Sequence, residues 1–227
     1  MKRLVITIDG PAGSGKSTTA RLVAQRLGYA YLDTGAMYRG MTVKALEQGI
    51  DISRPEALAE MARRTEVRVE TDPEGTRIIV DGRDVTDLLR EPRVTRNASA
   101  VSAARGVRER MVELQRKIGL DGGIVAEGRD IGSVVFPQAE VKIYLEADLN
   151  CRAARRQRDL AQVGLSADPS KVEQEISARD RYDSTREHSP LVVPEGAVII
   201  DNTDLTIEEQ VDRVIEEVAK KLGEGGV

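Results

Sequence analysis

The chain has 227 residues, 40% of them hydrophobic and 32% charged, and this length suits one core with an insertion better than two large domains. Its net charge of −4 and aromatic content of 3% argue against a nucleic-acid-binding surface, which would be basic and carry exposed rings for stacking. Arginine outnumbers lysine by 26 to 8. The planar arginine side chain can donate two hydrogen bonds at once to phosphate or carboxylate oxygens. A small, highly charged ligand in a local pocket is therefore compatible with the composition.

Cysteine and histidine are almost absent, since Cys151 and His188 are the only ones. An internal disulfide and a metal site built on these residue types are therefore excluded. The N-terminus lacks the pattern of a signal peptide, and no apolar run reaches membrane-spanning length. We expect a soluble, cytoplasmic protein with neither a nucleic-acid nor a membrane partner.

Five short β-branched or apolar runs predict strands, and most of them lack polar alternation, as is typical of strands buried on both faces. They lie at residues 4–8, 30–32, 123–126, 141–145 and 197–200. Helical patterns between or after them are expected at residues 17–27, 107–118 and 207–222, each followed by a glycine. Strands that alternate with helices predict a doubly wound parallel sheet of the α/β class.

The second and third of these strands lie much further apart than one crossover helix requires, which indicates an insertion. Within it, helices are expected at 36–48 and 56–63, followed by three short strands. The strands are expected at 66–70, 76–80 and 83–85, and Asp81-Gly82 is a strong hairpin signal. A second excursion, 152–190, is expected to be almost wholly helical and is rich in arginine.

A phosphate-binding motif follows the first predicted strand and opens a helix. The segment matching G-x-x-x-x-G-K-[ST] is Gly10-Pro11-Ala12-Gly13-Ser14-Gly15-Lys16-Ser17. Its backbone N–H groups and the positive end of the helix dipole would hold phosphate oxygens. We expect Lys16 to reach the β and γ phosphates and Ser17 to give its hydroxyl to Mg²⁺. The chain is therefore expected to bind a nucleoside triphosphate with Mg²⁺, as an enzyme or as a switch.

Polar residues also follow two other predicted strands, at the edge where open α/β sheets bind ligands. Thr34 is expected to cap the following helix, and Arg39 is a candidate ligand for a second phosphate. Glu127, Arg129 and Asp130 follow the third strand, where such charges are costly to hold unless they are paired or bind something.

Two predicted helices present arginines on one face. Arg179, Asp183 and Arg186 share a face by their i, i+4, i+7 spacing, which suits either a ribose and phosphoryl site or a solvated ion-pair ladder. Arg152 and Arg155 share a face with Arg156, and this face is either a lid over a transferring phosphate or a solvated surface.

Together these segments resemble the bacterial cytidylate kinases, within the nucleoside monophosphate kinases, over nearly the whole chain. The motifs that carry the resemblance lie at 32–39, 97–99, 107–108, 128–132, 135–137 and 179–186. The resemblance implies a P-loop NTPase fold, a three-layer α/β/α core with a five-stranded parallel sheet, at 1–35, 105–150 and 188–227. It further implies an inserted NMP-binding subdomain with a three-stranded antiparallel sheet at 36–104, and a short Arg-rich helical lid at 151–187.

The resemblance also implies an activity and its residues: a monomeric kinase that transfers the γ-phosphoryl group of ATP to CMP and dCMP with Mg²⁺. The implied catalytic residues are Lys16, Arg129, Arg155 and Arg186. The implied ATP-binding residues are Gly10, Pro11, Ala12, Gly13, Ser14, Gly15, Lys16, Ser17, Thr18 and Arg156, with Ser17 also contacting the metal. The implied CMP-binding residues are Thr34, Tyr38, Arg39, Ser99, Arg108, Gly128, Arg129, Asp130, Arg179, Asp183 and Arg186.

Within that set, the resemblance gives Asp130 the amino group of cytosine, and Arg108 and Ser99 the acceptor side of the base. Asp183 is the implied ribose contact, one that tolerates loss of the 2′-hydroxyl. From the residues alone, two alternatives stay open: a kinase for UMP, AMP or a non-nucleotide metabolite, and a nucleotide-dependent switch. The second is disfavoured because residues 201–204 lack the lysine of a guanine-binding motif.

Overall fold

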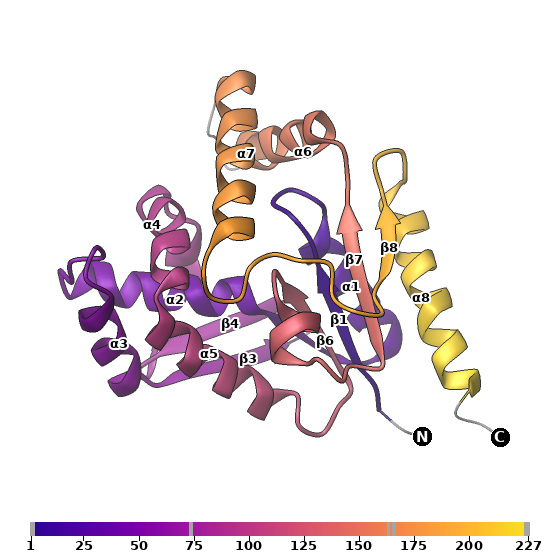
Figure 1. Ribbon diagram of the computed structural model, residues 1–227, viewed down its shortest axis with the longest axis horizontal. Coiled ribbons are helices and arrows are strands. Elements are labelled where there is room, and N and C mark those ends of the chain that lie inside the picture. Colours follow the sequence, from indigo (N-terminus) through magenta and orange to yellow (C-terminus); the bar gives the residue numbers. More distant parts are fainter. Residues whose placement is uncertain (1–2, 73–74, 163, 165–166, 225–227) are drawn as a thin grey trace.

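The computed structural model describes residues 3–72, 75–162, 164 and 167–224. Its main sheet has five parallel strands in the order β2-β6-β1-β7-β8, drawn as arrows in Figure 1. The strands are β1 (Val5–Asp9), β2 (Ala30–Asp33), β6 (Ile124–Gly128), β7 (Val141–Glu146) and β8 (Val198–Asp201). The predicted five-stranded parallel sheet of the α/β class is therefore confirmed.

Helices cover both faces of this sheet. Successive side chains of a strand point to opposite faces, and apolar side chains on each face pack against helices. Tyr31 and Val125 belong to the apolar cluster formed with α1 (Lys16–Leu27) and α8 (Ile207–Glu224). Their neighbours Leu32 and Ala126 belong to the cluster formed with α2 (Thr34–Glu47) and α5 (Arg105–Ile118). The central strands β1 and β6 are thus buried on both faces, as their unbroken apolar runs predict. The prediction is wrong for β8, because it lies at the sheet edge and Val198 and Ile199 are 38% and 52% exposed.

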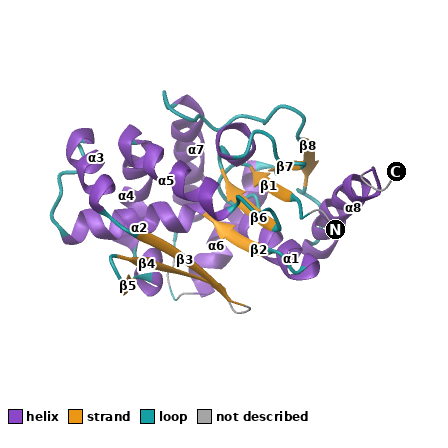
Figure 2. Cartoon of the chain, turned by 90° about the horizontal axis from the view of Figure 1, so that it is seen from below, coloured by secondary structure: helices purple, strands orange, loops and turns teal. Residues whose placement is uncertain are grey.

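A separate antiparallel sheet follows the second strand of the main sheet, and Figure 2 shows it beside α2. Its strands are β3 (Val67–Asp72), β4 (Gly75–Val80) and β5 (Arg83–Asp84). Asp81 and Gly82 both have positive φ, 49° and 80°, as a two-residue type I′ hairpin requires. The predicted three-stranded sheet and its Asp-Gly hairpin are therefore confirmed.

Two helices frame this small sheet, α3 (Pro55–Arg64) before it and α4 (Pro92–Ala103) after it. The sequence patterns did not predict α4, since Thr95, Asn97 and Ser99 are weak helix formers. The helix forms nevertheless, because Pro92 suits its first turn and its apolar side packs into the core shared with α2. A 3-10 turn, Thr86–Arg90, and a π-helical turn, Ile131–Val135, complete this part of the chain.

Two helices lie beyond the carboxyl ends of the main strands, α6 (Leu149–Gln162) and α7 (Pro169–Thr185) (Figure 1). The expected helical stretch ends at Thr185 rather than at 190, because Arg186 leaves the helical region with ψ of 144° and the chain then runs as a loop. Residues 163, 165 and 166, between the two helices, lie outside the described residues.

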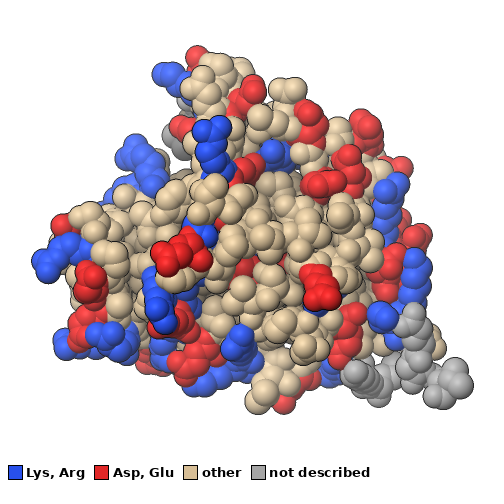
Figure 3. All heavy atoms as spheres, viewed as in Figure 1, with Lys and Arg blue, Asp and Glu red and all other residues tan. Residues whose placement is uncertain are grey.

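Charged side chains of both signs are interspersed along the edges of the face seen in Figure 3. None of the helices in the described part of the chain is both long and apolar enough to cross a membrane.

Candidate functional site

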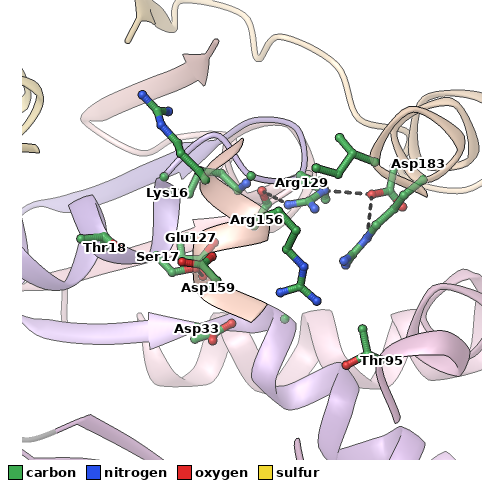
Figure 4. Close-up of a pocket in the computed structure, with 18 of the residues that line it drawn as sticks. Lys16, Ser17, Thr18, Asp33, Thr95, Glu127, Arg129, Arg156, Asp159 and Asp183 are labelled. Carbon is green, nitrogen blue, oxygen red and sulfur yellow. Dashed lines mark hydrogen bonds and ion pairs between the residues drawn. The ribbon is translucent and has the colours of Figure 1, made fainter. Parts of the chain in front are cut away.

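A cavity of about 1080 Å³ lies at the carboxyl edge of the main sheet, between the P-loop, α2, α4, α6 and α7. One end is lined by Lys16, Ser17 and residues 203–207, which follow β8. The other end is lined by side chains from α2, α4, α5, α7 and the loop after β6 (Figure 4). The cavity therefore joins the predicted phosphate loop to the predicted second substrate site.

The P-loop takes a backbone path that only glycine permits at its first position. Gly10 has a φ of 150°, and a Cβ there would lie 2.1 Å from the carbonyl oxygen of Leu145. Gly15, with a φ of 86°, is the N-cap of α1, so the helix begins at Lys16 and directs its amino end into the cavity. This arrangement is the anion site that the motif predicts.

Lys16 lies inside the loop with only 5% of its surface exposed. Its Nζ donates to the carbonyl oxygen of Pro11 at 2.7 Å, and Ser14 Oγ lies 3.4 Å away. Burial, reinforced by the positive charge of Arg129, lowers the pKa of Lys16 from 10.5 to about 7. A phosphate bound in the loop would place negative charge beside Lys16 and would favour its charged ammonium form.

Ser17 and Glu127 place two hard oxygen ligands side by side. The Ser17 hydroxyl donates to Glu127 Oε1 at 2.6 Å, and burial together with the Asp33 carboxylate raises the pKa of Glu127. Oxygen donors of this kind fit Mg²⁺, which binds through one or two protein oxygens plus substrate phosphates. The described residues contain no cluster of three or more His, Cys, Asp or Glu able to hold a metal on their own. A magnesium ion here would accordingly depend on nucleotide phosphates.

Helix α2 begins at Thr34 rather than at the predicted residue 36, and its N-cap lies one residue before the predicted one. Asp33, not Thr34, is the N-cap: its Oδ1 accepts from the Ala36 amide at 2.8 Å and its Oδ2 from Arg39 Nη2 at 2.9 Å. The prediction that Thr34 caps the helix is wrong, because Thr34 is already helical. Its hydroxyl instead donates to the Glu127 carbonyl oxygen at 2.7 Å, joining the two strand ends.

Asp130 and Arg108 form an ion pair whose side chains are each only 4% exposed. Arg108 also donates from Nη1 to the Ser102 carbonyl oxygen at 3.1 Å, and its guanidinium lies 5.1 Å from the centre of the Tyr38 ring. Asp130 therefore points one carboxylate oxygen at a cation that is itself fixed. The family resemblance gave Asp130 the amino group of the base and Arg108 its acceptor side, and did not foresee that the two residues pair with each other.

Asp183, on α7, contacts a second group of arginines. Arg129 Nε donates to Asp183 Oδ2 at 2.9 Å, as the dashed line in Figure 4 marks. Arg186 Nη1 lies 3.9 Å from Asp183 Oδ1, and Arg179 Nε lies 3.9 Å from Oδ2. The side chain of Arg186 is 6% exposed, and burial and the nearby Arg108 lower its pKa.

Positive charge exceeds negative charge in this part of the cavity. Its lining includes five arginines beside three aspartates: Arg39, Arg108, Arg129, Arg179 and Arg186 beside Asp33, Asp130 and Asp183. Nη2 of Arg186 is buried without a hydrogen-bond partner among the residues described. Cations that are partly buried and incompletely paired favour an anionic ligand of several oxygens.

The arginines of α6 divide between two tasks. Arg156 and Arg158 line the cavity, and Figure 4 shows Arg156 projecting into it. Arg155 also lines it, but its guanidinium donates to the side-chain and main-chain oxygens of Asn202, both at 2.8 Å. Arg152 is not in the lining, since it is buried against the P-loop. The interpretation that Arg152 shares a ligand-facing surface is therefore corrected.

Two buried polar residues at strand ends escaped sequence reasoning. Asn202, after β8, donates from Nδ2 to the Ser14 carbonyl oxygen at 2.7 Å and so supports the P-loop. Asp9, at the end of β1, accepts from the amides of Ile131 and Gly132 at 2.8 and 2.7 Å, and burial raises its pKa to about 7. Their position at the ligand edge of the sheet was the available signal.

A phosphate loop with a serine–carboxylate pair, joined by one cavity to an arginine-rich chamber, defines a P-loop phosphotransferase for two anionic substrates. Comparisons with known proteins agree. The family model described as cytidylate kinase matches residues 6–220. The chain is 46% identical to the cytidylate kinase of Geobacillus kaustophilus (strain HTA426), covering 98% of this chain and 99% of that protein. The cytidylate kinase of Enterococcus faecalis (strain ATCC 700802 / V583) is 48% identical, with 98% of each covered.

The chain therefore belongs to the cytidylate kinase family, and with it to the nucleoside monophosphate kinases. Among solved structures it is similar to shikimate kinase from Bacteroides thetaiotaomicron, with a TM-score of 0.51 and 12% identity over 95% of this chain and 98% of that one. That likeness concerns the fold alone.

Proposed function

We propose that this chain transfers the γ-phosphoryl group of ATP to CMP and dCMP, giving ADP and the corresponding diphosphate. The observation that carries the proposal is the buried Asp130–Arg108 pair, set beside an arginine cluster in the same cavity as the P-loop. Such a reaction needs three parts: an acidic group that recognises the base, a cluster of cations that binds the acceptor phosphate, and a loop that binds the triphosphate.

The base would present its amino group to Asp130 and its neighbouring acceptor atoms to Arg108, which contacts Asp130, and to Ser99 in the same cavity. Cytosine offers an amino donor to a carboxylate, and the contact with Arg108 fixes the direction of the Asp130 side chain. Uracil would present an oxygen to the same carboxylate, which is repulsive, so mispairing contributes to the choice. Tyr38, buried beneath the Arg108 guanidinium, would support this edge of the site.

The acceptor phosphate would lie among Arg39, Arg129 and Arg186. Nη2 of Arg186, which is buried without a hydrogen-bond partner among the described residues, supports a ligand of several oxygens at this place. Asp183, with Arg179, would face the ribose. Thr34 and Gly128, which also line the cavity, would complete the wall between the two phosphates.

The donor phosphates would lie in the P-loop, on the backbone N–H groups of Gly13, Ser14 and Gly15 and at the amino end of α1. Lys16 would contact the β and γ phosphates, and Thr18 and Arg156 would lie at the same end of the cavity. Ser17 and Glu127 would hold Mg²⁺ together with the phosphates, where the ion neutralises charge on the triphosphate when it is bound.

The chemistry needs no strong base, because the attacking oxygen of a monophosphate is already anionic at neutral pH. The difficulty is to hold two polyanions together in line, so catalysis rests on positioning and on positive charge around the transferring group. Lys16, Arg129 and Arg186 supply that charge from the wall of the cavity, and Arg155 from α6. We further propose the division into a core, an NMP-binding part at 36–104 and a lid at 151–187.

An assay of ADP production over a panel of acceptors tests the proposal. Purified protein with ATP and Mg²⁺ is supplied in turn with CMP, dCMP, UMP, AMP, GMP and shikimate. We expect CMP and dCMP to give the highest kcat/KM. No ADP production above the acceptor-free rate with CMP would refute the proposal, and a preference for another acceptor would move the chain to that substrate.

A further inference from the structure

The P-loop residue Ala12 is held on three sides by α6 and α7. Its amide donates to Asp180 Oδ1 at 2.9 Å, and its carbonyl oxygen accepts from Arg152 Nη1 at 3.0 Å. Its methyl group belongs to a small apolar cluster with Val172 and Ile176 of α7. Both hydrogen-bonding groups of one P-loop peptide residue are therefore engaged by the two helices, and neither is left for a phosphate.

Arg152 and Asp180 are also paired with each other, since Arg152 Nη1 contacts Asp180 Oδ2. Arg152 Nε donates to the Ala147 carbonyl oxygen at 3.0 Å, so the guanidinium is fixed from two directions. The two side chains are 11% and 18% exposed. Neither of them lines the cavity, so the pair is set apart from the groups proposed to touch substrate.

The P-loop packs closely on α6 beside this pair. A Cβ at Gly13 would lie 2.9 Å from the carbonyl oxygen of Arg152 and 3.2 Å from its Cβ. With no room between them, a displacement of the loop must move the first turn of α6 as well.

The same helix that contacts the P-loop through Asp180 reaches the arginine cluster through Asp183. The two residues are three positions apart on α7, a rise of about 4.5 Å along a helix axis. Asp183 holds Arg129 at 2.9 Å, and Arg186 follows at the end of the helix. One rigid segment therefore links the donor-phosphate loop to the groups that surround the acceptor.

We propose that Arg152 and Asp180 are a positioning pair that couples the P-loop to the acceptor-binding end of α7, so that each substrate strengthens the binding of the other. The inference rests on the proposed function for the identity of the acceptor. A triphosphate that orders the P-loop also orders Ala12, and through it the pair and α7. The acceptor then binds arginines that are already in place, and the coupling is reciprocal.

Two variants divide the contributions of Asp180. Asp180→Asn keeps an oxygen for the Ala12 amide but loses the charge that faces Arg152, and Asp180→Ala loses both. The matched control is Glu173→Ala, which removes a carboxylate from the same helix. The Glu173 side chain makes no hydrogen bond or ion pair among the described residues and is absent from the cavity lining.

The first measurement is the Kd of CMP by calorimetry, without and with saturating Mg²⁺ and the non-hydrolysable analogue AMP-PNP. We expect CMP to bind at least about fivefold more tightly with the analogue in the unmodified protein and in Glu173→Ala, within the usual range of such coupling. The ratio should fall below about twofold in Asp180→Ala and lie between in Asp180→Asn. A merely structural role would weaken binding without changing this ratio.

The second measurement needs no acceptor: hydrogen exchange of α7 amides with and without AMP-PNP. We expect the analogue to slow exchange around Asp183 in the unmodified protein but not in Asp180→Ala. If CMP fails to bind while this protection and its loss are seen, the proposed function fails and the coupling stands. An unchanged ratio and unchanged protection in Asp180→Ala overturn the coupling. Should that variant not fold, Asp180→Asn and Arg152→Lys carry the same two outcomes.

Discussion

Replacing Asp130 by Asn changes the hydrogen-bonding character of one buried group and leaves its size unchanged. Asp130 faces Arg108, and its Oδ1 lies 3.8 Å from Arg186 Nη2. In the variant, the amide oxygen should turn to Arg108, because an NH₂ group there would meet another donor. The NH₂ group then faces the base, where it repels the cytosine amino group and matches the uracil oxygen.

The size of the effect follows from the contact that is exchanged. A good side-chain contact to a base edge discriminates by about 1–3 kcal/mol, and about 1.4 kcal/mol corresponds to a tenfold ratio. Because the contact is lost for CMP and partly gained for UMP, the CMP/UMP ratio of kcat/KM should fall by about 100-fold. The free energy of unfolding should fall by about 1–3 kcal/mol, since a hydrogen bond to a charged group is weakened.

The assay is ADP production at saturating ATP with CMP or UMP as the varied substrate, together with the KM for ATP. The matched control is Asp159→Asn, an exposed carboxylate of α6 in the lining of the same cavity, for which the ratio should not change. A CMP/UMP ratio within about twofold of the unmodified protein, in a folded Asp130→Asn variant, would remove Asp130 from base recognition.

Two further predictions concern the protonation of the P-loop and the packing of the loop after β6. With a pKa of about 7, Lys16 is mostly neutral at pH 8 without ligand. Binding of Mg²⁺ and AMP-PNP should therefore be accompanied by proton uptake, which calorimetry in buffers of different ionisation enthalpy measures. The Lys16→Met variant should lack this uptake. Because folding lowers this pKa, the free energy of unfolding should also rise between about pH 7 and 10.5, and Lys16→Met should not show this rise. Gly132→Ala would place a Cβ 2.8 Å from Thr7 Oγ1 and 3.2 Å from Asp9 Oδ2, so urea denaturation should show a loss of about 1–3 kcal/mol. At Gly223 an added Cβ would meet no atom of another residue within 4 Å, apart from its own helix and chain neighbours. The Gly223→Ala variant should therefore have an unchanged or higher free energy of unfolding.

Much of the fold was predictable because its signals are local. Unbroken apolar runs predict strands buried on both faces, and Asp81-Gly82 predicts a two-residue hairpin whose positive φ angles the structure contains. Helix α4 was missed because its stability comes from packing against α2 rather than from helix-forming residues. The end of α7 was placed five residues too late, since the helix stops at Thr185 without a glycine.

The site residues that directly follow a strand could be predicted from the sequence. Those whose role depends on which side of a helix packs against the rest of the protein could not. Residues 12–13 and 15–17 of the P-loop motif and residues 128–130 after β6 line the cavity, whereas Gly10, Pro11 and Ser14 do not. Arg108 and Asp130 are 22 residues apart, and only the folded chain brings them into a pair. Arg152 and Arg156 share a helical face by spacing, yet the first is buried against Ala12 and the second projects into the cavity.

Transfer of a labelled phosphoryl group tests the central claim most directly. The protein is incubated with Mg²⁺, CMP and ATP that carries ³²P at the γ position, and the products are separated. We expect the label in CDP, in amounts equal to the ADP formed, with little in inorganic phosphate. Label that appears as inorganic phosphate at the same rate with and without CMP would contradict the account, because the cavity would then activate water rather than a monophosphate.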